Sequence, residues 1–241
     1  MLHTIRCYIS IILVTIIFGS AGVFFSLFFK RYVFKYAIQP WGKYILKGCG
    51  IDLTVEGAEY LNVQPSIIMY NHQSAFDIFA FCAAMPIKWK AVMKKEVATI
   101  PFVGWVCRLT GQYFVARDGS TNDLKAVKEI SDKIRNGPSV LIAPEGTRSE
   151  DGRLLPFKKG GFVIALKAKV PVITMVITGG YNIKNKKSYK INEGSMKVTL
   201  LEPIYVENFE QGRPGREKLE LLIRKNMDQV INREQSFDLA V

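Results

Sequence analysis

The stretch that decides the fold runs from Ser66 to Met85 and reads SIIMYNHQSAFDIFAFCAAM. Its first five residues form a short apolar run with two consecutive isoleucines, which is typical of a buried strand. A second apolar run begins at Phe76, and Ser74 with Asp77 fits the capping-box pattern that marks the start of a helix. The stretch therefore predicts a strand that leads into a helix, with His72 in the loop between them.

Short apolar runs and helical patterns alternate over the rest of the chain beyond about residue 50. Further strands are predicted at residues 52–56, 112–116, 139–143, 171–177 and 195–201. Apolar residues at helical spacing predict helices over residues 121–135 and 219–231. This alternation predicts an α/β fold, with a mixed and partly parallel sheet flanked by helices.

The N-terminal part contains a long uncharged segment, from Tyr8 to Phe29. Its 22 residues would form a helix about 33 Å long, enough to cross a bilayer core of about 30 Å. A cleaved signal peptide is the competing interpretation, because Arg6 precedes the apolar run and the small residues 19–22 could form a cleavage site. The apolar run continues beyond these small residues, which favours an anchor. We therefore expect residues 1–48 to form a membrane-anchoring helical segment and residues 49–241 to form one catalytic domain.

The small residues 19–22 lie in the middle of this segment and could break the helix. Two half-helices that enter only one leaflet are then an alternative to a full crossing. The cations that follow the segment are Lys30, Arg31, Lys35, Lys43 and Lys47. By the positive-inside rule, the sequence predicts a protein of the inner, cytoplasmic membrane whose catalytic domain faces the cytoplasm.

The composition is that of a globular protein in contact with lipid. Hydrophobic residues make up 49% of the chain and charged residues 22%, which is too apolar for a disordered chain. The net charge of +12 would attract the protein to polyanions such as anionic membrane lipids. No nucleic-acid-binding motif accompanies this charge, so nucleic acid is not an expected partner. The four cysteines lie far apart without a C-x-x-C pair, so neither a zinc site nor a disulfide framework is expected.

Three predicted strands end in residues that could form a site, namely His72, Arg117, and Glu145 to Arg148. In α/β folds ligands bind where strands end, so one histidine and two arginines are expected to share an edge of the sheet. Each residue also has an ordinary structural explanation. Helix capping alone could explain Asp77, and His72 could be a hydrogen-bonded structural residue. Each arginine could be a surface cation.

The combination of these residues favours a chemical role. An imidazole oriented by a carboxylate can act as a general base, and arginines can hold an anionic group beside it. The chain lacks the G-x-S-x-G and P-loop motifs and any cluster of metal ligands, so no protein nucleophile or metal centre is evident. A histidine base without a protein nucleophile would deprotonate a substrate hydroxyl. The arginines then suggest a phosphate-bearing substrate, and the membrane segment suggests a lipid.

Four blocks of sequence carry a resemblance to a known family. They are NHQSAFD at 71–77, GQYFVAR at 111–117, APEGTRS at 143–149 and VPVITMVITG at 170–179. In order and spacing they resemble the motifs of the glycerolipid acyltransferases, most closely the bacterial 1-acyl-sn-glycerol-3-phosphate acyltransferases. The resemblance covers roughly residues 50–205, and NHxSxxD followed about seventy residues later by PEGTRS is a specific pattern.

The resemblance implies a role for each matching residue. It makes His72 the catalytic base and Asp77 the carboxylate that orients it. The residues implied in binding the acceptor are Lys94, Gly111, Phe114, Arg117, Glu145, Gly146, Thr147 and Arg148. Arg148 would be the phosphate contact, whereas the assignment of Lys94 is ambiguous because Lys95 follows it. Pro171 would bind the acyl donor or shape the acyl pocket.

The implied activity is transfer of an acyl group to the sn-2 hydroxyl of lysophosphatidate, which forms phosphatidate in phospholipid biosynthesis. The acyl donor would be acyl-CoA or acyl carrier protein, and neither a metal nor a cofactor is implied. Another lysolipid or glycerol 3-phosphate remains possible as the acceptor. A non-catalytic lipid-binding module is the alternative from a different class, although such a module would be expected to lose His72 or Asp77.

Overall fold

A sheet of seven strands forms the centre of the computed structural model, which describes residues 1–116 and 121–238. The strands are β1 (Ile51–Glu56), β2 (Ile67–Tyr70), β3 (Trp89–Lys94), β4 (Tyr113–Val115), β5 (Ser139–Ile142), β6 (Val172–Thr178) and β7 (Gly194–Leu200). Their order across the sheet is β1-β7-β6-β2-β5-β3-β4. Neighbouring strands are parallel except for β6 and β7, which are antiparallel. The expected α/β fold with a mixed, partly parallel sheet is confirmed.

One strand, β3, is missing from the set that the sequence patterns predict. Its sequence WKAVMK buries Trp89 and Ala91, but the lysines between and after them hide the apolar alternation. Lys90 lies over the aromatic ring of Tyr113 on the neighbouring strand β4, with its Nζ 4.9 Å from the ring centre. A lysine can thus occupy a strand when its apolar stem packs on a ring and its charge stays near water.

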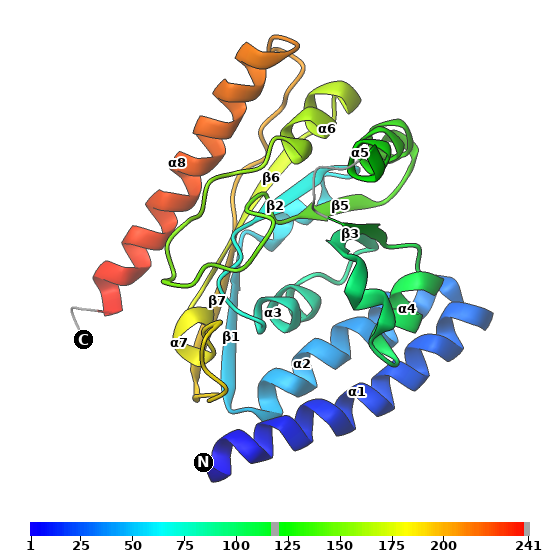
Figure 1. The fold of residues 1–241 in the computed structure, drawn as a ribbon, viewed down its shortest axis with the longest axis vertical. Helices are drawn as coiled ribbons and strands as arrows, with labels where there is room; N and C mark the ends of the chain where they lie inside the picture. Colours follow the sequence, from blue (N-terminus) through cyan, green and yellow to red (C-terminus); the bar gives the residue numbers. More distant parts are fainter. Residues whose placement is uncertain (117–120, 239–241) are drawn as a thin grey trace.

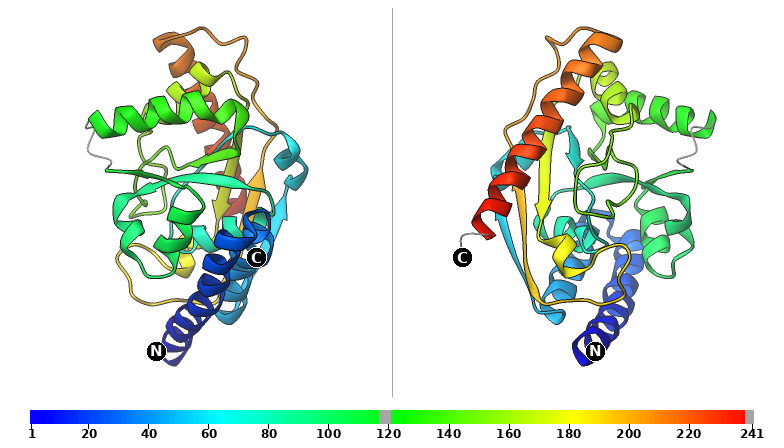
Figure 2. Two further views of the ribbon diagram at one scale, coloured as in Figure 1. Left: turned by 90° about the vertical axis from the view of Figure 1, so that its right-hand side faces the viewer. Right: turned by 60° about the vertical axis from the view of Figure 1, so that its left-hand side comes forward.

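Helices enclose the sheet on both faces (Figures 1 and 2). The α-helices are α1 (Leu2–Phe28), α2 (Gln39–Gly48), α3 (Asp77–Ala84), α4 (Val103–Leu109), α5 (Thr121–Lys133), α6 (Gly160–Ala168), α7 (Gly180–Ile183) and α8 (Arg213–Asp238). The shorter helical segments are η1 (Lys30–Tyr32), η2 (Phe34–Ile38), η3 (Ala58–Asn62), η4 (Lys95–Thr99) and η5 (Ile134–Asn136). Side chains from α1 to α4 form one apolar core with the sheet, and those from α5, α6 and α8 form the other.

Strand β2 shows why the strand before His72 is apolar throughout. It lies between β6 and β5, and successive side chains of a strand point to opposite faces of the sheet. Ile67 and Met69 therefore enter the core beneath α6 and α8, whereas Ile68 and Tyr70 enter the core beneath α2 and α3. Because both faces are covered, the strand before His72 cannot shift its register without exposing apolar side chains.

The N-terminal helix α1 is continuous from Leu2 to Phe28, so the break considered at residues 19–22 does not occur. The small residues instead allow α1 to lie against α4. A Cβ atom at Gly19 would lie 2.5 Å from the Cβ of Phe102, and one at Gly22 would lie 2.7 Å from a methyl group of Val106. The missing side chains thus allow close helix packing rather than a kink.

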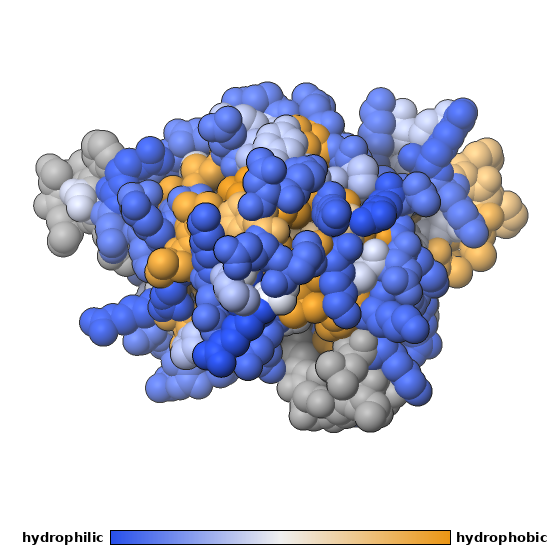
Figure 3. All heavy atoms as spheres, turned by 90° about the horizontal axis from the view of Figure 1, so that it is seen from above, coloured by the Kyte–Doolittle hydropathy of each residue, from blue (hydrophilic) through white to orange (hydrophobic). Residues whose placement is uncertain are grey.

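Helix α1 is long and apolar enough to cross a membrane, with a mean hydropathy of 2.4 over its most apolar window. Many of its large apolar side chains are exposed, including Ile5, Ile9, Ile12, Leu13, Ile16, Ile17, Phe24 and Leu27. By contrast, the end of the molecule that carries α5, α6 and the beginning of α8 is mostly hydrophilic (Figure 3). These features indicate association with a membrane through α1.

The N-terminal helices share an apolar core with the rest of the chain. Cys7 of α1 and Ile45 of α2 are fully buried in the same cluster as Ile68 and Phe81. The expected boundary between residues 48 and 49 falls between the end of α2 and the start of β1. The N-terminal segment therefore packs on the sheet domain along its length and is not a detached anchor (Figure 1).

Candidate active site

One edge of the sheet carries most of the residues expected in the site. Strands β2, β3 and β5 are parallel, so their carboxyl ends meet at this edge. His72 follows β2, Lys94 is the last residue of β3, and Glu145 to Arg148 follow β5. The two motif loops touch directly, because the backbone N–H of Ser149 donates a hydrogen bond to the carbonyl of His72 at 2.8 Å.

His72 and Asp77 form a close pair within this edge. The Nδ1 atom of His72 lies 2.8 Å from Oδ2 of Asp77, and because an ionised carboxylate can only accept, Nδ1 carries the proton. The side chain of Asp77 is 0% exposed, whereas that of His72 is 21% exposed. The Nε2 atom of His72 forms no hydrogen bond with the described residues, so it is available as a base.

Asp77 also organises the backbone of the loop at residues 71–76, which we call the catalytic loop because it carries the expected base His72. Its Oδ2 accepts hydrogen bonds from the N–H groups of Gln73 and Ser74, at 2.8 and 2.9 Å. Asp77 is the first residue of α3, so one carboxylate both closes the loop before the helix and orients the imidazole. The capping and catalytic interpretations of this residue are therefore compatible.

Glu145 supports the same loop from the other side. One oxygen of its buried carboxylate accepts the backbone N–H of His72 at 2.7 Å, and the other accepts the N–H of Leu155 at 2.9 Å. Burial raises the pKa of Glu145 above its ordinary value, while the two backbone hydrogen bonds act in the opposite direction. Both carboxylate oxygens are thus engaged by the protein itself, which makes Glu145 a positioning residue for His72.

The C-terminal helix α8 extends this support, although its sequence pattern predicts packing alone. Arg224 of α8 donates hydrogen bonds to the carbonyls of Leu155 and Leu154, at 2.9 and 3.1 Å, and its guanidinium lies over the ring of Phe157. A continuous series of contacts therefore runs from α8 through Leu155 and Glu145 to the backbone of His72.

Glu145→Gln is expected to lower kcat by roughly 10- to 100-fold, because small displacements of a catalytic base carry costs of this size. Glutamine has one acceptor oxygen, whereas the backbone N–H groups of His72 and Leu155 each need one. One of these two N–H groups therefore loses its hydrogen bond. Steady-state kinetics and a thermal unfolding curve would measure both effects. The matched control is Glu129→Gln on the surface of α5, which should retain full activity. Full activity in Glu145→Gln would contradict the positioning role.

Three polar residues around His72 anchor the loop through contacts that the sequence patterns do not predict. Both ends of the Asn71 side chain bond the backbone of Ile177 on β6, at 2.7 and 2.9 Å. Gln73 donates to the carbonyl of Gly152 at 2.6 Å, and Ser74 donates to the carbonyl of Lys184 at 2.7 Å. All three lie in the NHQSAFD block and Ser74 also fits the capping box, but these patterns do not indicate which backbone groups the side chains bond.

Comparison with known proteins identifies the family. A family model described as Acyltransferase matches residues 52–178, which include the His72 and Glu145 loops.

The chain belongs to the acyltransferase family.

Individual relatives agree with this assignment. The 1-acyl-sn-glycerol-3-phosphate acyltransferase of Saccharomyces cerevisiae is 34% identical over 169 residues, which cover 69% of this chain and 56% of that protein. The beta form from Homo sapiens is 32% identical over 142 residues, which cover 58% of this chain and 51% of that protein. This acyltransferase thus spans about half the length of the curated relatives it matches.

A solved structure matches over a larger share of both chains. The 1-acyl-sn-glycerophosphate acyltransferase PlsC from Thermotoga maritima superimposes with a TM-score of 0.78, at 26% identity and with 95% of each chain covered. The His72 and Asp77 pair agrees with the H-x4-D motif of these enzymes. The α/β fold and the long apolar N-terminal helix are therefore features of a known acyltransferase architecture.

The other expected site residues of the acyltransferase lie in different places. Gly146 has a positive φ of 72°, and Thr147 is exposed beside it. Arg148 is partly exposed and makes no hydrogen bond or ion pair within residues 1–116 and 121–238. Lys94 is exposed and lies 3.4 Å from the carboxylate of Glu96. Arg117 lies outside the described residues.

The structure does not bring Gly111 and Pro171 to this edge. Gly111 precedes β4 and Pro171 precedes β6, and both strands run parallel to the neighbours that carry the site. Both residues therefore lie toward the amino ends of the strands, where Gly111 has a positive φ of 72° and Pro171 accepts the backbone N–H of Ile67. Phe114 lies within β4 and is partly buried.

Two glycines follow β6, and the first packs against β7 whereas the second packs against the loop that carries His72. Gly179 has a positive φ of 81°, and a Cβ atom there would lie 2.1 Å from the carbonyl of Ser195. A Cβ atom at Gly180 would lie 2.8 Å from Oδ1 of Asp77 and 3.0 Å from the Cβ of Ser74. The acyltransferase therefore requires glycine at position 180 to keep Asp77 in place.

Gly180→Ala is expected to lower kcat by roughly 10- to 100-fold, because the added methyl group would push Asp77 away from His72. Neither Asp77 nor Ser74 can yield easily, since both side chains are fully buried. The matched control is Gly160→Ala, where the new Cβ atom would meet Val127 at an ordinary 3.5 Å. Initial-rate kinetics on both variants would measure the difference, and equal activities would contradict the packing argument.

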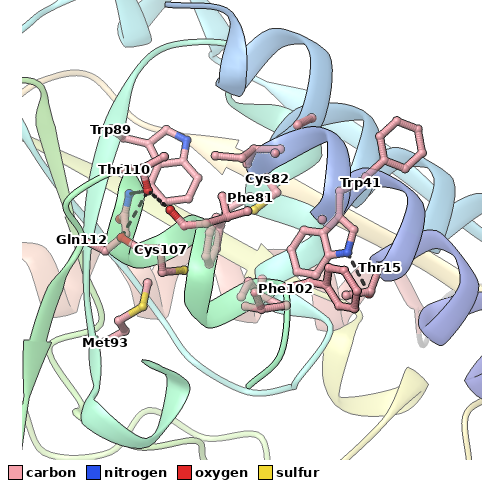
Figure 4. Close-up of a pocket in the computed structure, with 18 residues that line it drawn as sticks. Thr15, Trp41, Phe81, Cys82, Trp89, Met93, Phe102, Cys107, Thr110 and Gln112 are labelled. Carbon is pink, nitrogen blue, oxygen red and sulfur yellow. Dashed lines mark hydrogen bonds between the residues drawn. The ribbon is translucent and has the colours of Figure 1, made fainter. Parts of the chain in front are cut away.

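A narrow apolar cavity lies between α1, α2, α3 and α4 and is shown in Figure 4. Its volume is about 60 Å³, and its lining includes Trp41, Phe81 and Phe102. Edge-to-face ring contacts link its lining residue Phe81 to His72, because the ring centre of Tyr70 lies 5.8 Å from that of His72 and 5.4 Å from that of Phe81. This acyltransferase therefore has an apolar pocket whose wall is in contact with the residues around its histidine.

Proposed function

We propose that the protein transfers an acyl group from an acyl thioester to the sn-2 hydroxyl of 1-acyl-sn-glycerol 3-phosphate and so forms phosphatidate. The observation that carries the proposal is the His72 and Asp77 pair, in which a buried carboxylate fixes Nδ1 and Nε2 has no hydrogen bond to the described part of the chain. The names of the yeast, human and Thermotoga maritima relatives support the choice of acceptor.

The pair supports a direct transfer without an acyl-enzyme intermediate. Nε2 of His72 takes the proton from the acceptor hydroxyl as its oxygen attacks the thioester carbonyl, and Asp77 stabilises the imidazolium that forms. Collapse of the tetrahedral intermediate breaks the C–S bond. The proton on Nε2 then passes to the leaving thiolate, which restores the neutral histidine.

The two substrates would approach from different sides of His72. The acyl chain of acyl-CoA or acyl carrier protein would enter the apolar cavity next to Tyr70 and Phe81. A volume of about 60 Å³ is the space of roughly two water molecules, so the side chains around the cavity must move to admit an acyl chain. The phosphate of the acceptor would bind Arg148, together with Arg117 and Lys94 as the family resemblance implies.

The membrane arrangement follows from α1. We propose that residues 1–48 anchor the protein, that residues 49–241 form the catalytic domain, and that this domain faces the cytoplasm. The exposed apolar side chains of α1 support contact with lipid, and the basic residues after it support the cytoplasmic side. A soluble thioester would then arrive from the water and a single-chain lipid from the membrane.

The test is product formation by the purified full-length protein in lipid vesicles, with protein-free vesicles as the background. Lysophosphatidate is offered with acyl-CoA and with acyl carrier protein as donors, and the product is identified by mass spectrometry. Phosphatidate formation with either donor would support the proposal. A clear preference for glycerol 3-phosphate or another lysolipid would overturn the acceptor, and no turnover with any acceptor would favour a lipid-binding module.

Arg148→Ala is expected to raise the KM for lysophosphatidate by about 10- to 100-fold, because a bidentate guanidinium contact to phosphate would be lost. The KM for the acyl donor should stay within about twofold, since the donor chain binds on the other side of His72. Arg153→Ala is the matched control, because Arg153 is an exposed arginine of the same loop. An unchanged KM for lysophosphatidate in Arg148→Ala would exclude it as the phosphate contact.

A further inference from the structure

Two segments that are distant in the sequence lie side by side next to the active site. The carboxylate of Glu150 pairs with Lys186 at 2.9 Å and with Lys187 at 3.1 Å. The ring of Tyr181 packs beneath Gly152, where a Cβ atom would meet the ring at 3.2 Å. These contacts join the loop at residues 148–152 to the segment at residues 181–187.

Both segments are also fixed to the loop that carries His72. The N–H of Ser149 donates to the carbonyl of His72 at 2.8 Å, and the hydroxyl of Ser74 donates to the carbonyl of Lys184 at 2.7 Å. Arg148 is adjacent to the first of these anchors, and Lys184 forms the second. Two cations therefore flank the catalytic loop on neighbouring segments.

The four cations of these two segments differ in whether they have a carboxylate partner. Lys186 and Lys187 are neutralised by Glu150, but within the described ranges neither Arg148 nor Lys184 forms an ion pair. The Nζ of Lys184 donates one hydrogen bond, to the carbonyl of Ser188 at 2.5 Å, which leaves two of its three N–H groups for a ligand.

The electrostatics of Lys184 agree with this placement. Its pKa is lowered from the ordinary value, first by partial burial and second by the positive charge of Arg148. Holding two cations close together without an anion costs free energy, and a bound anion would relieve this repulsion. A phosphate monoester has three terminal oxygens, so it can accept from a guanidinium and an ammonium at the same time.

We propose that Lys184 binds the phosphate monoester of the acceptor lipid together with Arg148, beside His72. The proposal rests on the proposed function and adds to it a residue outside the four motif blocks. Lys184 would hold the phosphate on the side of the catalytic loop formed by α7 and its following segment. It would thereby select acceptors that carry a terminal phosphate over uncharged ones.

The test compares Lys184→Met, which keeps an apolar stem without the charge, with Lys184→Arg, which keeps the charge. The matched control is Lys187→Met, which removes the same charge from the same segment at a position already neutralised by Glu150. Each full-length variant is assayed in vesicles of fixed composition. Lysophosphatidate is varied at saturating acyl-CoA, acyl-CoA is varied at saturating lysophosphatidate, and uncharged 1-acylglycerol serves as a second acceptor.

Lys184→Met is expected to raise the KM for lysophosphatidate by about tenfold, the size of one charge-assisted hydrogen bond. Its KM for acyl-CoA and its rate with 1-acylglycerol should stay within about twofold, and Lys184→Arg and Lys187→Met should resemble the wild type. An unchanged KM for lysophosphatidate in Lys184→Met would overturn the proposal. An increase in the KM for acyl-CoA alone would also overturn it, because the cation would then serve the phosphates of the donor.

An equal increase in the KM for lysophosphatidate in Lys187→Met would also overturn the proposal, because the effect would then be general attraction to the membrane. If the wild-type protein does not use lysophosphatidate at all, the proposed function itself fails, which is a separate outcome. In that case inorganic phosphate provides the remaining test. Phosphate should protect the wild type against thermal unfolding more than it protects Lys184→Met, and equal protection would overturn the role of Lys184.

Discussion

His72→Ala is expected to lower kcat by about 10²- to 10⁴-fold, the range that general acid–base catalysis contributes. The variant keeps the two backbone hydrogen bonds to Asp77 from Gln73 and Ser74, so the loop should retain its shape. It loses one donor to a buried carboxylate, which should cost about 1–3 kcal/mol of stability. Phosphatidate formation and a thermal unfolding curve measure the two effects separately.

The control for His72→Ala is the other histidine of the chain. His3 lies near the start of α1, beside Glu193 and Cys7, and His3→Ala should retain activity because it lies on a different segment from the catalytic loop. Wild-type kcat in His72→Ala would remove the general-base role. A folded protein that has lost turnover but still binds both substrates would support that role.

Asp77→Asn is expected to lower kcat by about 10³- to 10⁴-fold while the protein stays folded. Its amide oxygen can take the place of Oδ2 and accept from His72, Gln73 and Ser74, but an uncharged amide cannot stabilise the imidazolium. The amide nitrogen would then occupy the place of Oδ1, which is buried without a hydrogen-bond partner among the described residues and faces Gly180. A modest loss of stability should accompany the loss of activity.

The double variant His72→Ala with Asp77→Asn tests whether Asp77 acts through His72 or contributes to turnover independently. If Asp77 acts through His72, the double variant should have the same kcat as His72→Ala alone. Multiplicative losses would show that Asp77 contributes to turnover without the imidazole. Asp52→Asn is a suitable control, because Asp52 is an exposed residue at the start of β1.

The sequence could predict the edge on which the site lies but not how the site is held. The alternation of apolar runs and helical patterns indicates parallel strands, and parallel strands place their carboxyl ends on one edge. His72, Glu145 and Arg148 could therefore be assigned to that edge in advance. Gly111 and Pro171 belong to the other two motif blocks, but they precede their strands and lie toward the other end of the sheet.

The supporting contacts could not be predicted because they join segments far apart in the chain. The family resemblance implies a role for Glu145 in acceptor binding, but it gives no indication that its two oxygens bond the backbone of His72 and Leu155. The role of Gly180 depends on the place of Asp77, which only the folded chain determines. Likewise, the small residues 19–22 are compatible with either a break in the helix or close packing of another helix. Only the contacts with Phe102 and Val106 show that they allow close packing.

Helix α1 has different neighbours on its two sides. Thr15, Gly19 and Gly22 form part of the wall of the apolar cavity, whereas Ile9, Ile16 and other large side chains point outward. With the acyl chain bound in this cavity, as we propose, truncating α1 to obtain a water-soluble protein would remove part of the binding site. The acyl-chain preference of such a fragment would then differ from that of the chain with α1. Exchanging α1 with that of a relative should alter membrane affinity and chain preference together, because a single helix serves as both the lipid contact and the cavity wall.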